Sequence, residues 1–99
     1  MNIRIQSIHF DASEQLQEFI QKKVAKLEQY CDNINNLEVS LKVEKPETAK
    51  NKRAGIKVAA MNSEFFAEKV CDTFEEAVDE SLEALIRQIK KYKEKMRGK

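Results

Sequence analysis

Residues 37–44 alternate strictly between apolar and polar side chains, in the order Leu-Glu-Val-Ser-Leu-Lys-Val-Glu. Successive side chains of a β-strand point to opposite faces, so this segment predicts a strand with one buried face and one face in water. A sheet of such strands needs a second layer over its apolar face, and 99 residues leave room for one such layer. We therefore predict a single two-layer domain over residues 1–99.

Three further segments have strand character. They are residues 2–9, 53–60 and 64–70, where apolar side chains alternate with polar ones over at least part of the segment. A loop at 45–52, which holds the only proline, and a turn at Asn62-Ser63 join the last three predicted strands, so we expect these strands to be antiparallel neighbours. Phe65 and Phe66 are adjacent in the last strand and must point to opposite faces, so one of them is expected to be exposed.

Two segments with apolar residues at helical spacing supply the covering layer. The first predicted helix spans residues 13–30, with Asp11 and Ser13 as candidate N-caps. The second begins after Asp72 or Thr73, and its apolar stripe consists of Phe74, Val78, Leu82, Leu85, Ile89, Tyr92 and Met96. The order is then β-α-β-β-β-α, an α+β sandwich with two helices on one face of a four-stranded sheet.

Several classes of function find no support in the residues. Cys31 and Cys71 are far apart and His9 is the only histidine, so we expect ordinary thiols and no metal site. No GxSxG, P-loop, GxGxxG or HExxH motif is present, so we expect no enzyme, no cofactor and no small-molecule substrate. The chain has neither a long apolar segment nor the apolar stretch of a signal peptide, so we expect a cytoplasmic protein without a membrane partner.

The net charge of +1 hides an uneven distribution along the second predicted helix. Residues 72–83 carry six acidic side chains and no basic one, whereas residues 87–99 carry seven basic side chains and Glu94 as the only acid. Acids near the N-terminus and bases near the C-terminus stabilise a helix through its macrodipole, but one or two bases would suffice for that effect. Seven bases in thirteen residues indicate a surface for a polyanion, with a solvated helix face as the alternative.

The candidate binding residues are basic side chains that the helical repeat places outside the apolar stripes. If the two helices lie side by side, these residues form one continuous surface for an RNA backbone. Tyr30 and Tyr92 fall close to the apolar stripes and tryptophan is absent, so we expect recognition of phosphates and shape rather than of bases. The candidates are Lys22, Lys23 and Lys26 in the first helix and Arg87, Lys90, Lys91 and Lys95 in the second.

Two stretches carry a family resemblance over most of the chain. The first is Ala25-Lys26-Leu27-Glu28-Gln29-Tyr30, followed by Asp32, by Ile34-Asn35 and by Leu41-Lys42-Val43-Glu44-Lys45. The second is Ala77-Val78-Asp79, leading into Leu85-x-Arg87-Gln88-Ile89-x-Lys91 and on to Lys95. Together they resemble the bacterial ribosome hibernation-promoting factors, a family that includes the ribosome-associated inhibitor and has the older label of sigma-54 modulation protein.

The resemblance implies a fold like the double-stranded-RNA-binding domain with an added first strand. It also implies a partner, the small ribosomal subunit, whose channel for messenger and transfer RNA the protein would occupy, blocking translation in stationary phase or starvation. Lys23, Lys26, Arg87, Lys91 and Lys95 match the basic positions that contact rRNA in the family. The chain resembles the short members, which lack a C-terminal dimerisation domain, and we expect it to bind as a monomer.

Some positions depart from the family pattern. Gln29 and Ala84 stand where relatives often have a basic residue, and Glu75 stands at a commonly aromatic position. We suggest that Lys22 and Lys90 compensate for the missing bases. Two alternatives stay open: a protein-interaction module that modulates sigma-54-dependent transcription through the acidic segment 72–83, and a free-standing binder of double-stranded RNA.

Overall fold

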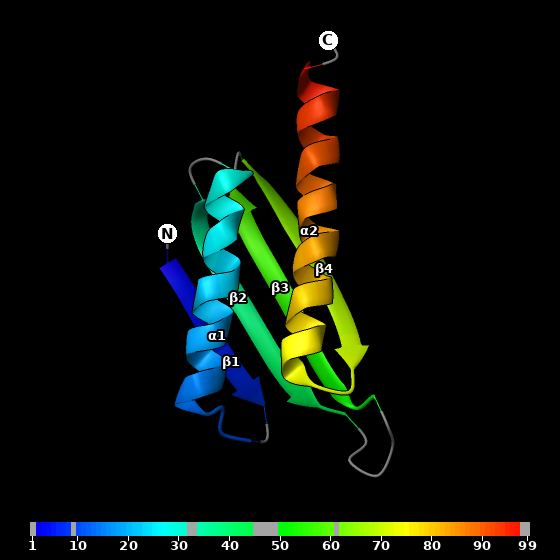
Figure 1. Ribbon diagram of the computed structural model, residues 1–99. Helices are drawn as coiled ribbons and strands as arrows, with labels where there is room; N and C mark the ends of the chain where they lie inside the picture. The colour runs from blue at the N-terminus through cyan, green and yellow to red at the C-terminus, as the bar shows by residue number, and fades with distance from the viewer. Residues whose placement is uncertain (1, 9, 32–33, 45–49, 61, 98–99) are drawn as a thin grey trace.

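The elements of the chain follow the predicted order. The computed structural model describes residues 2–8, 10–31, 34–44, 50–60 and 62–97, without the side chain of Arg97. His9, Asp32-Asn33 and the loop 45–49, on which parts of the predictions fall, lie outside the described residues. The elements are β1 (Asn2–Ile8), α1 (Glu14–Val24), the 3₁₀ helix η1 (Ala25–Gln29), β2 (Ile34–Val43), β3 (Lys52–Ala60), β4 (Ser63–Cys71) and α2 (Phe74–Arg97) (Figure 1).

The four strands form one sheet in the order β1-β2-β3-β4. β2, β3 and β4 are antiparallel neighbours, as predicted from their short connections. β1 instead pairs with β2 in parallel, from Asn2 opposite Asn36 to Ile8 opposite Lys42. A parallel neighbour requires a crossover connection, and α1 with η1 provides it. The sheet therefore has β1 and β4 as its two edges.

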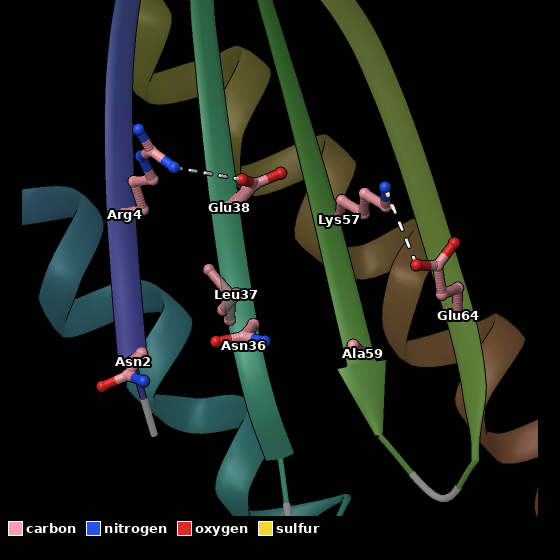
Figure 2. Close-up of a pocket in the computed structure, with 8 residues that line it drawn as sticks. All are labelled: Asn2, Arg4, Asn36, Leu37, Glu38, Lys57, Ala59 and Glu64. Atoms are coloured by element: carbon pink, nitrogen blue, oxygen red, sulfur yellow. Dashed lines mark ion pairs between the residues drawn. The ribbon is translucent and has the colours of Figure 1, made fainter.

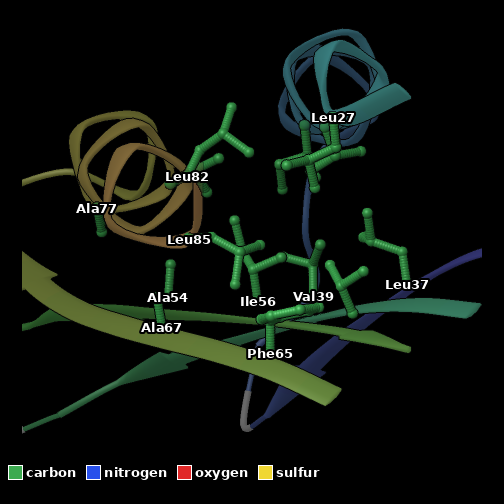
Figure 3. Close-up of a cluster of buried hydrophobic side chains, with 14 of the residues drawn as sticks. Leu27, Leu37, Val39, Ala54, Ile56, Phe65, Ala67, Ala77, Leu82 and Leu85 are labelled. Atoms are coloured by element: carbon green, nitrogen blue, oxygen red, sulfur yellow. The ribbon is translucent and has the colours of Figure 1, made fainter. Parts of the chain in front are cut away.

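Both helices cover the same face of the sheet, which confirms the predicted two-layer sandwich (Figure 1). The core lies between the helices and this face (Figure 3). The alternating residues Leu37, Val39 and Leu41 of β2 and the stripe residues Leu85 and Ile89 of α2 are completely buried there. Burial of such side chains stabilises the fold by about 1.5–3 kcal/mol each, which makes this layer the main source of stability.

Both α-helices begin at a side-chain cap. Ser13 Oγ accepts a hydrogen bond from the Leu16 backbone N–H at 3.1 Å, so Ser13, and not Asp11, is the N-cap of α1. Thr73 Oγ1 accepts from the Glu76 backbone N–H at 3.1 Å at the start of α2. The other candidate there, Asp72, accepts from the Lys50 backbone N–H at 2.9 Å and so fixes the chain before β3.

Two details of the predicted helices were wrong. The first helix does not continue as an α-helix to residue 30, because it tightens into η1 after Val24. The apolar stripe of the second helix does not end at Met96, whose side chain is 65% exposed. α2 continues past the end of the sheet, so its last turns have no strand beneath them (Figure 1). Tyr92 is the last stripe residue that packs, with its ring edge-on to Phe65 at 5.3 Å between centroids.

The face of the sheet that the helices leave uncovered is called the open sheet face below. It carries the side chains that alternate with the core residues of the four strands, and the strand registers align them in rows across the sheet. From the β1 edge to the β4 edge, the rows are Asn2, Asn36, Ala59 and Glu64; Arg4, Glu38, Lys57 and Phe66; Gln6, Ser40, Gly55 and Glu68; and Ile8, Lys42, Arg53 and Val70.

Candidate nucleic-acid interface

The two helices lie side by side and run in the same direction (Figure 1). Lys23 Nζ of α1 lies 3.1 Å from Asp79 Oδ1 of α2, and Lys90 Nζ of α2 lies 5.2 Å from the ring centroid of Tyr30, just after η1. Lys23 comes before Tyr30 in the chain, and their partners Asp79 and Lys90 come in the same order. The two helices are therefore parallel, and their C-terminal ends lie at the same end of the molecule. This arrangement brings together the basic ends of both helices, which the sequence analysis required for a continuous surface.

The second half of α2 carries most of the basic residues. Arg87, Lys90, Lys91 and Lys95 are all exposed. Among the described residues, no carboxylate forms an ion pair with any of them. Their charges therefore remain available to an anionic partner. We call these four residues, with Lys22, Lys23 and Lys26, the basic helix surface.

The α1 part of this surface is less uniform. Lys22 and Lys26 are exposed, but the change to a 3₁₀ turn after Val24 displaces Lys26 from the position that a continuous α-helix would give it. Lys23 is half-buried, with its ammonium 5.5 Å from the ring centroid of Phe19 and paired with Asp79. Its charge is thus already partly compensated within the protein. The helices that carry the seven predicted residues lie side by side (Figure 1), and Lys23 differs from the other six in having an ion-pair partner among the described residues.

Three contacts fix α2 on the sheet. Ser81 Oγ, completely buried, donates to the Ala54 carbonyl oxygen of β3 at 2.9 Å. Gln88 Nε2 donates to the Phe66 carbonyl oxygen of β4 at 2.8 Å, one residue after Arg87. The edge-on contact of Tyr92 with β4 lies between Lys91 and Lys95 along the helix. These contacts therefore anchor the helix that carries the bases to the sheet as far as Tyr92.

The first half of α2 has the opposite sign. Glu75, Glu76, Glu80 and Glu83 are exposed there, and Asp79 is half-buried. One helix thus has an acidic and a basic half, and the separation gives the domain a strong electric asymmetry. Such an asymmetry orients a protein as it approaches a charged surface and raises the association rate. An anionic partner would meet the C-terminal end of α2 first.

Cys71 belongs to a contact between β4 and the acidic half of α2. Its thiol donates to Glu80 Oε2 at 3.4 Å. The Cys71 Sγ and one carboxylate oxygen each of Glu76 and Glu80 lie within 4.8 Å of one another. Burial, followed by the hydrogen bond and charge of Glu80, raises the pKa of the Cys71 thiol to about 11. A thiol that stays protonated at neutral pH is a weak metal ligand and a weak nucleophile. Cys31 is likewise buried.

Two partners of the basic residues escaped the sequence analysis. Asp79 was placed in the acidic segment and in the second family stretch, and Tyr30 close to an apolar stripe and in the first family stretch, but neither residue was given a basic partner. No local pattern predicts that they meet Lys23 and Lys90, since these contacts depend on the packing of α1 against α2. Among the positions that depart from the family pattern, Gln29 and Glu75 are exposed and Ala84 is half-buried.

Comparison with known proteins gives one family. The sequence model of the family described as sigma 54 modulation protein / S30EA ribosomal protein matches residues 3–97. A ribosome hibernation promoting factor of Escherichia coli (strain K12) is 33% identical over 97 residues, which cover 98% of each chain. The Pseudomonas putida protein of the same name (strain KT2440) is 28% identical over 98 residues, covering 99% of this chain and 92% of its own.

Solved structures share the fold. A ribosomal subunit interface protein from Coxiella burnetii superposes with a TM-score of 0.79 at 24% identity, over 94% of this chain and 98% of its own. The N-terminal domain of Protein Y from Thermus thermophilus gives 0.79 at 22% identity, over 93% of this chain and 99% of its own. None of the helices within the described residues combines the length and apolarity needed to cross a membrane.

Proposed function

Because the chain belongs to the sigma 54 modulation protein / S30EA ribosomal protein family, we propose that it is a ribosome hibernation factor that binds rRNA of the small subunit. Family membership agrees with the resemblance carried by residues 25–45 and 77–95. In this proposal the protein acts in the cytoplasm, occupies the channel of messenger and transfer RNA, and stops translation under starvation or in stationary phase.

The observation that carries the proposal is the uncompensated charge of α2. Arg87, Lys91 and Lys95 are exposed side chains without an ion-pair partner among the described residues, on a helix that contacts with the sheet anchor as far as Tyr92. Each phosphate that such a side chain neutralises releases a condensed counterion, and this release drives binding. The mechanism then needs no chemical step, since a rigid domain in the channel excludes messenger and transfer RNA by its volume.

The first experiment is co-sedimentation of the purified protein with separated small and large ribosomal subunits over a series of salt concentrations. We expect pelleting with the small subunit, and about six phosphate contacts would lower the affinity on the order of 10³-fold between about 50 and 200 mM salt. Absence of binding to either subunit at low salt would refute the proposal.

Two additions to this experiment separate the remaining alternatives. Duplex RNA that competes as well as intact small subunits would indicate a general binder of double-stranded RNA. A partner captured equally well from nuclease-treated and untreated lysate would indicate a protein-interaction module, with the acidic half of α2 as its contact surface.

A further inference from the structure

The open sheet face carries charges that cancel. Among the described residues it has four basic side chains, and with Glu44 just after β2 it has four acidic ones. Every one of the four acids is paired: Glu38 with Arg4 at 4.0 Å, Glu64 with Lys57 at 3.7 Å, and Glu44 and Glu68 both with Arg53, the latter at 3.0 Å. Figure 2 shows two of these pairs across neighbouring strands.

This balance argues against RNA as the ligand of the open sheet face. Interfaces with nucleic acids are strongly positive, because cations of the protein replace counterions of the phosphates. Here a phosphate would meet cations that already have carboxylate partners, with the carboxylates beside them. The exception is Lys42, for which none of the described carboxylates is a partner.

The same face has an apolar anchor point. Phe66 is 52% exposed, the uncovered member of the Phe65-Phe66 pair, and its ring lies over Gly55. A Cβ on Gly55 would come within 3.3 Å of this ring, so the absence of a side chain lets the ring lie close to the sheet. Beside the ring is a hollow of about 220 Å³, with Ser40 and Gly55 as small residues and Ile8 and Lys42 among its walls.

We propose that the open sheet face docks an extended protein segment, which places an apolar or aromatic side chain beside Phe66 and an acidic side chain near Lys42. An exposed aromatic residue surrounded by polar and paired charged groups is the arrangement of a protein–protein hot spot. The inference rests on the proposed function, because a domain held on the ribosome by its helices turns this opposite face toward another component. Because the paired charges of this face disfavour rRNA, we take that component to be a ribosomal protein.

Site-specific crosslinking on the ribosome tests this assignment. p-Benzoylphenylalanine is incorporated in place of Phe66 in one sample and in place of Arg87 in another, and each protein is irradiated on purified ribosomes. We expect an adduct with a ribosomal protein from position 66 and an adduct with rRNA from position 87. An rRNA adduct from position 66, or no adduct there while position 87 reacts, would overturn the docking proposal.

The control position separates this failure from that of the proposed function. If position 87 gives no adduct and the wild-type protein does not pellet with ribosomes, the proposed function fails, and the docking surface with it. If the protein pellets and position 87 crosslinks to rRNA, the result at position 66 decides the docking proposal by itself.

Substitutions provide a second measurement. We expect Phe66→Ala to weaken ribosome binding by about five- to tenfold without a change in its salt dependence, and Lys42→Ala to weaken it by a similar factor with a shallower salt dependence, because a charge pair is lost. Val70→Ala is the matched control, since Val70 is an exposed apolar residue of the same strand and face, 38% exposed, outside the hollow. Full affinity in Phe66→Ala, or a loss in Val70→Ala as large as in Phe66→Ala, would overturn the assignment.

Discussion

The basic helix surface and the open sheet face both consist mostly of polar and charged side chains, yet opposite charges are paired on one and separated on the other. On the sheet, side chains of opposite sign stand on neighbouring strands and pair, as in Arg4 with Glu38. On α2 the signs are separated along the helix, so a basic residue such as Lys91 has other bases one turn away at Arg87 and Lys95. Whether a surface can bind a polyanion thus depends less on how many basic residues it has than on how many of them lack an acidic partner within the protein.

The difference follows from the geometry of the two layers. Strand register places residues of distant sequence opposite each other, which allows each acid of the open sheet face to meet a base. Within a helix the nearest neighbours are three and four residues apart, so a run of one sign stays unpaired unless another element supplies a partner. Among the described residues, Lys23 is the only member of the basic helix surface with an ion-pair partner, which is Asp79 of the other helix.

The largest effect is expected from reversing charge on the basic helix surface. Arg87→Glu with Lys91→Glu changes the charge of the contact surface by four units, and we expect about 10³-fold weaker binding to the small subunit near 0.15 M salt. The matched control, Arg4→Glu with Lys57→Glu, makes the same change on the open sheet face and should cost less than about tenfold. Co-sedimentation measures both, with circular dichroism as the check on folding; equal losses would refute the distinction between the two surfaces.

Stability should distinguish the two sides of the sheet in the same way. Leu85 is completely buried between α2 and the sheet, so Leu85→Ala is expected to lower the free energy of unfolding by about 3 kcal/mol through lost contacts and a cavity. Phe66→Ala, on the open sheet face, should cost about 1 kcal/mol or less. Urea denaturation measures both values. A similar cost for the two substitutions would mean that the open face contributes to folding as the core does.

The reactivity of thiols offers a third comparison, on adjacent residues of β4. Both proteins to be compared carry Cys31→Ala. The first keeps Cys71 as its only thiol, and the second combines Cys71→Ala with Val70→Cys. At pH 8 the thiol of Cys71 should react with iodoacetamide about 100-fold more slowly than the thiol introduced by Val70→Cys. The pKa of Cys71 is raised from 9.0 to about 11, so its thiolate fraction is about 100-fold smaller than that of an ordinary thiol. Equal rates would contradict both the raised pKa and the protection by α2.

The raised pKa of Cys71 also predicts the sign of a pH effect on stability. Above pH 9 the unfolded chain loses the thiol proton first, so this group's contribution to stability is complete below pH 9 and is lost as the pH rises toward about 11. Melting temperatures of the wild type and of Cys71→Ala between pH 8 and 11 should therefore converge. A constant difference over that range would contradict the assignment.

The smallest expected effect concerns the ion pair between the helices. Asp79→Asn removes the partner of Lys23, and we expect the logarithmic salt dependence of binding to steepen by about 0.9, as for one added phosphate contact. Glu83→Gln, one turn further along α2 and exposed, is the control and should leave the slope unchanged. An unchanged slope in Asp79→Asn would mean that released Lys23 does not reach the RNA.

The layers of this fold could be predicted because their patterns are local. The alternation at 37–44 lies in β2 as far as Val43, and the stripe from Phe74 to Ile89 lies in α2. Their apolar residues are buried as predicted, except that Val43 is only half-buried. The start of β2 was missed because the register shifts between Ile34 and Asn36, leaving Asn35 and Asn36 both exposed. A bulge of this kind interrupts the alternation on which the prediction depends.

The candidate site could be predicted only as a set of residues. Helical spacing predicted that Arg87, Lys91 and Lys95 avoid the core, and all three are exposed. It could not predict that Met96 lies beyond the sheet, because periodicity does not contain the length of the neighbouring strands. Nor could it predict that Lys23 pairs with Asp79, since that contact joins two helices that are separated in the sequence by the β2-β3-β4 meander.

The parallel pairing of β1 has a consequence for the time course of folding. Asn2 pairs with Asn36, 34 positions later, whereas β3 and β4 meet across the short turn between Ala60 and Ser63. Closing a longer loop costs more entropy and slows the formation of a contact. During synthesis β1 leaves the ribosome before β2, β3 and β4, and it has no neighbour until β2 has followed. When the whole chain refolds, β1 is expected to be the last of these four strands to join the sheet.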